Sequence, residues 1–206
     1  MSDNQSNMRK TTPTRVMKLV LIVTGLILAA IVVQIIVIFS GNEERMLRVQ
    51  CANNLRQIGA ALRQYAADHD GHFPEGRQNT VSSQFRLLSN YLGNSAQIFC
   101  CPRDLTKVAT NQLASITDAN ISYCYVRGLN RGTPANIPLC FDWGVGGEAG
   151  DGKPLSSFAG QSWKKESRHK GAGGTVLYCD GHTRFESIFP KPESGQNWST
   201  NIVEVP

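Results

Sequence analysis

The feature that most constrains this chain is an uncharged apolar stretch near its N-terminus. Residues 19–40, LVLIVTGLILAAIVVQIIVIFS, contain no charged side chain and only Thr24, Gln34 and Ser40 as polar ones. A helix of these 22 residues would extend roughly 33 Å, which is enough to cross the ~30 Å hydrocarbon layer of a membrane. The stretch is longer than the roughly 7–15 apolar residues of a signal peptide, and no small-residue cleavage motif follows it. We therefore predict an uncleaved transmembrane anchor at residues 18–41 rather than a buried core helix.

Charged residues on the two sides of this stretch predict its orientation. Residues 1–18 contain four basic residues and only Asp3 as an acid, whereas acidic and basic residues balance in GNEERMLRVQ directly after the stretch. The excess of positive charge places residues 1–17 in the cytoplasm as a disordered tail, and everything after Gly41 outside. The expected location is a membrane, with a single span and an extracytoplasmic C-terminal domain. The formal net charge of +5 falls to about +2 without residues 1–18, so it gives no reason to expect nucleic acid binding.

Apolar residues continue at helical spacing beyond the membrane stretch. Spacings of three and four residues separate the members of one stripe, which are Leu47, Cys51, Leu55, Ile58, Leu62 and Tyr65. This pattern predicts an amphipathic outer half of the same helix over residues 42–70. The helix should end in HDGHFP, because Gly71 can adopt the left-handed conformation of a helix C-terminus and Pro74 cannot continue a helix.

The remaining residues, 71–206, have the pattern of a small β domain. The segment SSQFRLLSNYLG predicts one short helix, opened by Ser82 or Ser83 and closed by Gly93. Short β-like runs separated by Gly, Pro and Asn follow, namely QIFCCP, ISYCYVR, IPLCFDW, TVLYC, TRFESI and NIVEV. The expected fold is α+β, with one long N-terminal helix packed on a small antiparallel β-sheet.

Several ordered motifs resemble a bacterial family of prepilin-like proteins, DUF1559, which is related to type IV pilins and type II secretion pseudopilins. The segment CANNLRQIGAALRQYAADHDGHFP resembles the part of these proteins that follows the membrane helix, and a Cys-Pro, a Ser-Tyr and a terminal His…Asp-Gly hairpin follow in the family order. The similarity covers about residues 45–188 and implies a pilin-like fold in which the matching residues have structural roles. It also implies that the membrane is the bacterial inner membrane and that the C-terminal domain is periplasmic. The matching positions are Cys51, Asn54, Leu55, Gln57, Ile58, Gly59, Phe73, Pro74, Cys101, Pro102, Tyr123, His169, Asp180 and Gly181.

Two features depart from the family pattern. Residues 19–40 contain no carboxylate, although pilins have a glutamate at the fifth position of the mature helix. In addition, ten residues rather than nine separate His169 from Asp180. The resemblance therefore leaves open whether a prepilin peptidase processes the chain and whether the chain enters a filament.

Candidate metal ligands gather in the C-terminal half of the chain. Major pseudopilins, which this chain resembles, bind calcium beside their C-terminal sheet, and the carboxylates that could supply oxygen ligands here are Asp142, Glu148, Asp151 and Asp180. A zinc site is a less favoured alternative, because neighbouring side chains along a strand point to opposite faces. Its ligands would come from His169, Cys179, Asp180 and His182.

A third interpretation of the His…Asp-Gly segment needs no ion. Asp180-Gly181 is typical of a two-residue β-hairpin with a type I′ turn, so Asp180 would bond within its own turn and His169 would brace the incoming loop. No nucleophile motif accompanies these residues, so no catalytic residue is assigned. Calcium is the leading cofactor candidate.

The six cysteines all lie in the part of the chain that is predicted to be exported, where disulfides can form. None of them forms a Cys-x-x-Cys pair, which argues against a zinc ribbon. A disulfide from Cys51 to either Cys100 or Cys101 would tie the outer half of the long helix to the sheet.

The function favoured by the resemblance is that of a non-enzymatic pilin-like subunit or accessory protein of a type II secretion or type IV pilus-like apparatus. Expected partners are the lipid bilayer and, through the transmembrane helix, copies of the same chain or other pilin-like subunits. The alternative is a monomeric, membrane-tethered domain that binds an envelope ligand with calcium, and the missing glutamate favours this second hypothesis.

Overall fold

The computed structural model describes residues 14–93, 95–146, 151–167 and 169–206. The chain divides into two compact units, unit 1 (Met1–Arg45) and unit 2 (Met46–Pro206). One helix, α1 (Thr14–Asp68), begins in the first unit and ends in the second. Most of the predicted cytoplasmic tail and the calcium candidate Glu148 lie outside the described residues.

Unit 1 contains the apolar part of α1. An 18-residue window of the helix has a mean hydropathy of 3.0, and none of its side chains is buried within the protein. Leu19, Leu28 and Ile36 each expose more than 60% of their surface. The helix is thus long and apolar enough to cross a membrane, and such a surface needs lipid or protein to cover it.

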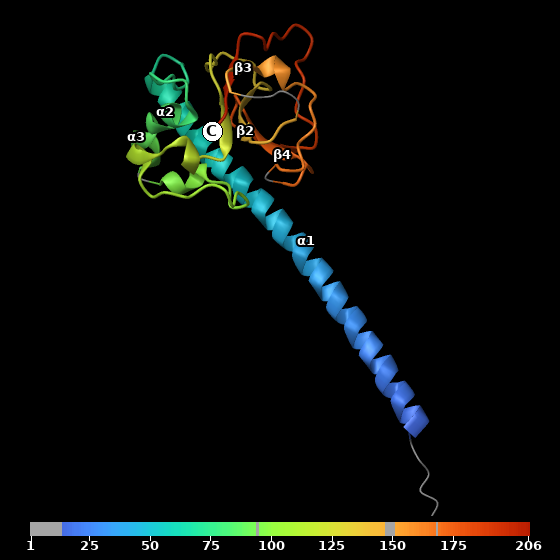
Figure 1. Ribbon diagram of the computed structural model, residues 1–206. Helices are drawn as coiled ribbons and strands as arrows, with labels where there is room; N and C mark the ends of the chain where they lie inside the picture. Colours follow the sequence, from blue (N-terminus) through green and yellow to red (C-terminus); the bar gives the residue numbers. More distant parts are fainter. Residues whose placement is uncertain (1–13, 94, 147–150, 168) are drawn as a thin grey trace, which may run out of the picture. The chain divides into compact units, whose positions relative to one another are not determined.

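Unit 2 is built on a six-stranded antiparallel sheet with the strand order β3-β6-β1-β2-β4-β5. Figure 1 labels β2, β3 and β4 of this sheet. Its strands are β1 (Tyr123–Val126), β2 (Pro138–Asp142), β3 (Lys153–Pro154), β4 (Gly174–Tyr178), β5 (Thr183–Glu186) and β6 (Ile202–Glu204). Every residue of β1, β2 and β4 is buried, so the centre of the sheet is covered on both faces. The predicted α+β fold, with a long N-terminal helix packed on an antiparallel sheet, is confirmed.

The second part of α1 packs on this sheet through the predicted apolar stripe. Cys51, Leu55, Ile58 and Leu62 are completely buried. Gly59 allows the closest approach to the sheet, because a Cβ atom there would lie 2.7 Å from a methyl carbon of Leu177 in β4. The stripe therefore belongs to the core of unit 2.

The C-terminus of α1 lies close to the predicted position. The helix ends at Asp68, and the amide of Gly71 donates a hydrogen bond to the carbonyl oxygen of Ala66 at 2.8 Å. Gly71 has the expected left-handed backbone with φ +83°, and Asp70 before it is also left-handed with φ +52°. This pattern satisfies a carbonyl group that the end of the helix would otherwise leave without a partner.

Two of the predicted elements are wrong. In place of one helix over residues 82–93 the chain forms α2 (Val81–Arg86) and α3 (Ser89–Leu92), and Thr80 rather than Ser82 or Ser83 caps the first of them. The run QIFCCP forms a 3₁₀ turn, η1 (Ala96–Phe99), and not a strand. A short apolar run fits a buried turn as well as a buried strand, so periodicity could not separate them. Three further 3₁₀ turns are η2 (Leu113–Ser115), η3 (Asp118–Asn120) and η4 (Leu155–Ser157).

The β4–β5 hairpin differs from the predicted two-residue turn. The amide of Tyr178 donates to the carbonyl oxygen of His182 at 3.0 Å, so the loop consists of the three residues 179–181. Gly181 has φ +91°, but Asp180 is not among the described non-glycine residues with positive φ. A type I′ turn needs positive φ at both central residues, so a three-residue loop that ends in a left-handed glycine replaces it.

Replacement of Gly173 by alanine should strongly destabilise unit 2. The residue has φ +147°, and an added Cβ would lie 2.5 Å from the carbonyl oxygen of Glu186. We expect Gly173→Ala to lower the free energy of unfolding by about 2–5 kcal/mol, the sum of backbone strain and overpacking. Urea denaturation followed by tryptophan fluorescence measures this loss, because all three tryptophans lie in unit 2.

The matched control for this substitution is Gly195→Ala. Gly195 also has a positive φ, of +84°, but no heavy atom lies within 4 Å of its hypothetical Cβ. Gly195→Ala should lower the free energy of unfolding by about 1 kcal/mol, because backbone strain is the only penalty there. Equal losses for the two variants would show that the contact with Glu186 is not the cause.

Candidate functional site

The most deeply buried ionisable pair described in the chain is His169 with Asp142. Nε2 of His169 lies 3.3 Å from Oδ2 of Asp142, and neither side chain exposes more than 1% of its surface. Asp142 is the last residue of β2, and His169 lies in the loop before β4. The backbone amide of Thr175 donates a hydrogen bond of 2.7 Å to the same carboxylate oxygen. The pair therefore joins two neighbouring strands where their side chains are fully buried.

A disulfide lies directly beside this pair. Of the two partners that the sequence left open for Cys51, the structure pairs Cys101, with the Cα atoms 5.5 Å apart. Cys101 follows η1, so the bond ties α1 to that turn rather than to a strand. The two sulfur atoms, one carboxylate oxygen of Asp142 and one ring nitrogen of His169 all lie within 4.8 Å of one another. We call these four residues the Cys–Asp–His centre.

Aromatic residues enclose the Cys–Asp–His centre. The ring of Phe185 meets the His169 ring edge to face at 5.5 Å, and the guanidinium of Arg48 lies 4.4 Å from the centre of the Phe185 ring. Burial, and then the negative charge of Asp142, raise the pKa of Tyr123 well above its ordinary value, so this hydroxyl stays neutral. Asn54 of α1 donates to the Cys100 carbonyl at 3.2 Å, which fixes the turn before the disulfide.

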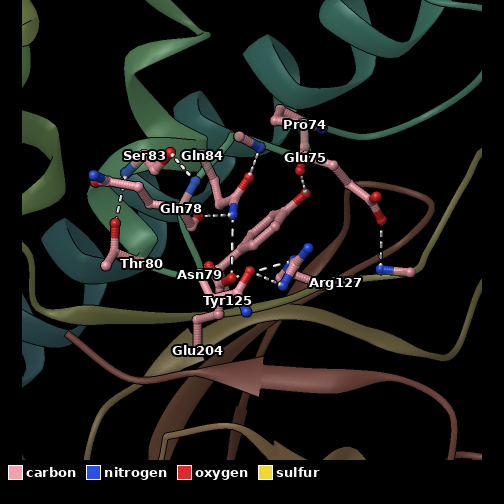
Figure 2. Close-up of polar contacts among 12 residues, drawn as sticks. Pro74, Glu75, Gln78, Asn79, Thr80, Ser83, Gln84, Tyr125, Arg127 and Glu204 are labelled. Carbon is pink, nitrogen blue, oxygen red and sulfur yellow. Dashed lines mark hydrogen bonds and ion pairs between the residues drawn. The ribbon is translucent and has the colours of Figure 1, made fainter.

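A second buried polar cluster surrounds Glu204 of β6 (Figure 2). Its Oε1 accepts a hydrogen bond from Nε2 of Gln84 at 3.1 Å and lies 3.2 Å from Nε of Arg127. The Gln84 amide also bonds to the backbone at Gln78 and Gly76, and Arg127 donates to Asn79 at 2.6 Å. These contacts connect the loop after α1 with the end of β1 and with β6. The cluster thus holds three distant segments together around one carboxylate.

Burial dominates the ionisation of Glu204. Loss of solvent raises its pKa from 4.5 to about 7, although the hydrogen bond from Gln84 and the charge of Arg127 act to lower it. The carboxylates of Asp151 and Asp118 raise the pKa further. The side chain exposes only 1% of its surface, so it binds a proton near neutral pH without being open to a substrate.

The structure separates most of the predicted metal ligands. Asp180 lies in the β4–β5 loop, is 43% exposed and accepts hydrogen bonds from the backbone and ring of His182. Asp151 accepts from the backbone amide of Val205 at 3.1 Å. Within the described part of the chain, the one cluster of three or more ligand side chains is the Cys–Asp–His centre, which contains Asp142 but neither of these aspartates. The alternative zinc ligands Cys179 and His182 are also outside it.

The sequence did not predict that these four residues lie close together. Cys51 was predicted to pair with either Cys100 or Cys101, His169 was assigned a bracing role, and Asp142 was considered for calcium. No local spacing connects them, because they come from α1, the segment after η1, the end of β2 and the loop before β4. The one available signal was that three of the four occur in the motifs that carry the family resemblance.

Comparison with known proteins supports that resemblance. Residues 44–98 match the family model described as protein of unknown function (DUF1559). The match covers about a quarter of the chain, and this segment is similar to that family. It includes the end of α1, both short helices and most of η1, and thus the motif residues from Cys51 to Pro74. No curated protein and no solved structure matches the chain.

The other motif residues lie beyond the DUF1559 match, and the structure shows how they connect to it. Cys101 is bonded to Cys51, and Nδ2 of Asn54 lies 3.5 Å from the hydroxyl of Tyr123. Arg63 donates a hydrogen bond from α1 to the carbonyl oxygen of Asp180. These contacts connect Cys101, Tyr123 and Asp180 to α1. The structural roles of the other motif residues stay predictions.

Loss of the Asp142 carboxylate should destabilise unit 2 far more than loss of the Asp180 carboxylate. Both aspartates contact a histidine, but the first contact is buried and the second is half exposed. We expect Asp142→Ala to lower the free energy of unfolding by about 3 kcal/mol or more, because it leaves buried polar partners behind. Asp180→Ala should change it by less than about 1 kcal/mol. Urea denaturation of the two variants tests this order, and a reversed order would contradict it.

The raised pKa of Glu204 predicts a pH dependence of stability. The folded protein holds this proton more tightly than the unfolded chain, so the stabilisation is complete below pH 4.5 and is lost as the pH rises towards 7. Glu204→Gln stays neutral at every pH. Its stability relative to the unmodified protein should therefore rise by up to about 3 kcal/mol between pH 4.5 and 8. Urea midpoints across this range measure the difference.

Glu75→Gln is the control for this experiment, because Glu75 is exposed and accepts a hydrogen bond from the neighbouring Gly128 amide at 3.2 Å. Its stability should follow the pH profile of the unmodified protein. If Glu204→Gln also follows that profile, the proton is not held by Glu204.

Proposed function

We propose that the chain is a non-enzymatic, membrane-anchored, pilin-like subunit that assembles with other pilin-like helices through the apolar part of α1. The observation that carries this proposal is the complete exposure of the apolar window of α1. The apolar helix and the disulfide indicate that unit 2 lies outside the cytoplasm. In a membrane, lipid alone can cover such a helix, but a polar residue within it favours contact with another helix.

Gln34 is that polar residue. It is exposed in the apolar part of α1, and its side-chain amide makes no hydrogen bond with any described residue, whereas the hydroxyl of Thr24 bonds to the Val20 carbonyl of its own helix at 2.9 Å. A glutamine amide in lipid gains a hydrogen bond when a second helix supplies a partner. Since residues 19–40 contain no carboxylate, Gln34 is the side chain that could orient neighbouring subunits in place of the pilin glutamate.

Burial of the Cys–Asp–His centre supports a non-enzymatic role. All four residues are buried, and a reacting group must be within hydrogen-bond reach of its substrate. The half-exposed His182 stacks on Tyr178 with ring centroids 4.3 Å apart and bonds to Asp180. These contacts stabilise the turn, so they give His182 a structural role. They support the proposal that the domain binds partners and is not an enzyme.

Photo-crosslinking in native membranes tests the proposed assembly. Helical geometry puts Ile38 on the same face as Gln34 and Ile36 on the opposite face. We expect a photoreactive residue at position 38 to give a ladder of multiples of 22.6 kDa, and the same residue at position 36 to give much less. Gln34→Leu should reduce the ladder about 3–20-fold, because one hydrogen bond between membrane helices contributes about 0.6–1.7 kcal/mol.

Thr24→Val is the matched control, because the hydroxyl of Thr24 already bonds within its own helix. It should leave the ladder unchanged. A single adduct with a different protein would identify an accessory subunit and its partner. Absence of adducts at both positions would reject assembly through α1 and favour the monomeric, membrane-tethered domain.

A further inference from the structure

We propose that reduction of the Cys51–Cys101 disulfide turns the Cys–Asp–His centre into a closed binding site for a zinc-like divalent cation. The four side chains would supply two thiolates, one imidazole nitrogen and one carboxylate oxygen. Sulfur and nitrogen ligands in a set of four are typical of structural zinc sites, and a carboxylate also binds zinc. This site differs from both metal sites that the sequence predicted, because it uses Cys51 and Cys101 and excludes Asp180.

The positions of the ligand atoms fit such an ion. Zinc bonds of about 2.3 Å to sulfur and about 2.0–2.2 Å to nitrogen or oxygen place tetrahedral ligands roughly 3.3–3.8 Å apart. The four ligand atoms already lie within 4.8 Å of one another. Shifts of about 1 Å therefore bring the nitrogen and oxygen atoms into place. The sulfur atoms need only separate once the disulfide opens.

Burial of Asp142 is the second observation that points to a cation. One carboxylate oxygen bonds to Thr175 and faces His169, but Oδ1 accepts no hydrogen bond from any described residue. A buried carboxylate oxygen without a partner is costly, and a bound cation would compensate it. Arg48, stacked on the Phe185 ring that contacts His169, supplies further positive charge. This charge offsets the net −1 of a dication with two thiolates and one carboxylate.

The reaction balances when a dithiol acts as the reductant. The dithiol transfers two electrons and two protons, the bond between Cys51 and Cys101 breaks to give two thiols, and the reductant becomes a disulfide. Binding of the cation then releases the two thiol protons to solvent, and neutral His169 coordinates through a ring nitrogen. The cation holds both sulfur atoms as thiolates, so it competes with reoxidation of the pair.

Cobalt binding to the full-length chain in detergent tests the site. A phosphine, which becomes the phosphine oxide with oxygen from water, reduces the disulfide without providing thiols. Alkylation in denaturant checks the redox state, because the six cysteines include two in the disulfide and should give four free thiols before reduction and six after it. We expect the reduced protein to bind one Co²⁺ per chain with thiolate-to-cobalt charge-transfer absorption and the visible bands of tetrahedral Co²⁺. The oxidised protein should show neither signal.

Variants in which every cysteine is retained distinguish cobalt binding at this site from binding at the other thiols. His169→Gln should weaken cobalt binding by more than about 100-fold. Loss of a residue that only hydrogen-bonds to a metal ligand lowers the metal affinity by up to about 100-fold, and His169 would be a ligand itself. His182→Gln is the matched control, since His182 also contacts an aspartate but lies outside the centre. Equal affinities of His169→Gln and the unmodified protein would overturn the proposal.

A measurement on the unmodified chain does not depend on the folding of any variant. Zn²⁺ should raise the melting temperature of the reduced protein and leave that of the oxidised protein unchanged, since a ligand that binds only the folded state stabilises it. Absence of both the charge-transfer band and this shift would also overturn the proposal. Neither readout depends on assembly through α1, so failure of the metal site and failure of the proposed function are distinguishable.

Discussion

The packing of the second part of α1 on the sheet is the contact on which unit 2 depends. Four of its side chains, Cys51, Leu55, Ile58 and Leu62, are completely buried. Burial of each large apolar side chain contributes about 1.5–3 kcal/mol relative to exposure, so this stripe outweighs any surface ion pair of the domain. The strands are short, between two and five residues, and they need a helix against one face to form a stable core. The same helix continues into the apolar part of unit 1, so the apolar stretch and the domain core share one element.

Periodic features of this architecture were predictable from the sequence, because they follow from burial along a single element. The long apolar stretch of α1, the stripe from Cys51 to Leu62 and the left-handed Gly71 are of this kind. Five of the six β-like runs form strands for the same reason, whereas β3 contains only two residues and has no pattern to detect. QIFCCP was assigned wrongly because four apolar residues in a row satisfy a strand and a buried 3₁₀ turn equally well.

The candidate site was predictable only in part, because it depends on contacts between distant segments. The choice between Cys100 and Cys101 required the position of the turn after Phe99, which the sequence does not encode locally. Asp142 meets His169 because β2 and β4 are neighbours in the sheet, although 27 residues separate the two side chains. Nothing in the spacing of these residues distinguishes a buried pair from two solvated loop residues.

The two buried polar clusters occur where the remote parts of the chain meet, and this position explains why polar groups are kept there. Glu204 of β6 contacts Gln84 of α2 and Arg127 after β1, and the Cys–Asp–His centre joins α1 to β2 and to the loop before β4. Apolar residues of similar volume could stabilise either junction as well, but they would accept many alternative packings. A buried carboxylate needs specific hydrogen-bond donors, so it is compatible with few of these alternative packings. This restriction fixes how the segments pack against one another.

Closure of the chain at Cys51 has a consequence for the two states of the Cys–Asp–His centre. The disulfide closes a loop over a sequence separation of 50 residues, which restricts the unfolded chain by about 4 kcal/mol in the loop-entropy model. A cation held by both sulfur atoms would close the same loop, and it adds His169 and Asp142 to the cross-link. Reduction without a cation therefore removes the restriction, whereas reduction with a cation preserves it. The cross-link between α1 and the rest of the domain would then be present in the oxidised protein and in the reduced protein with a bound cation. It would be absent from the reduced protein without a cation.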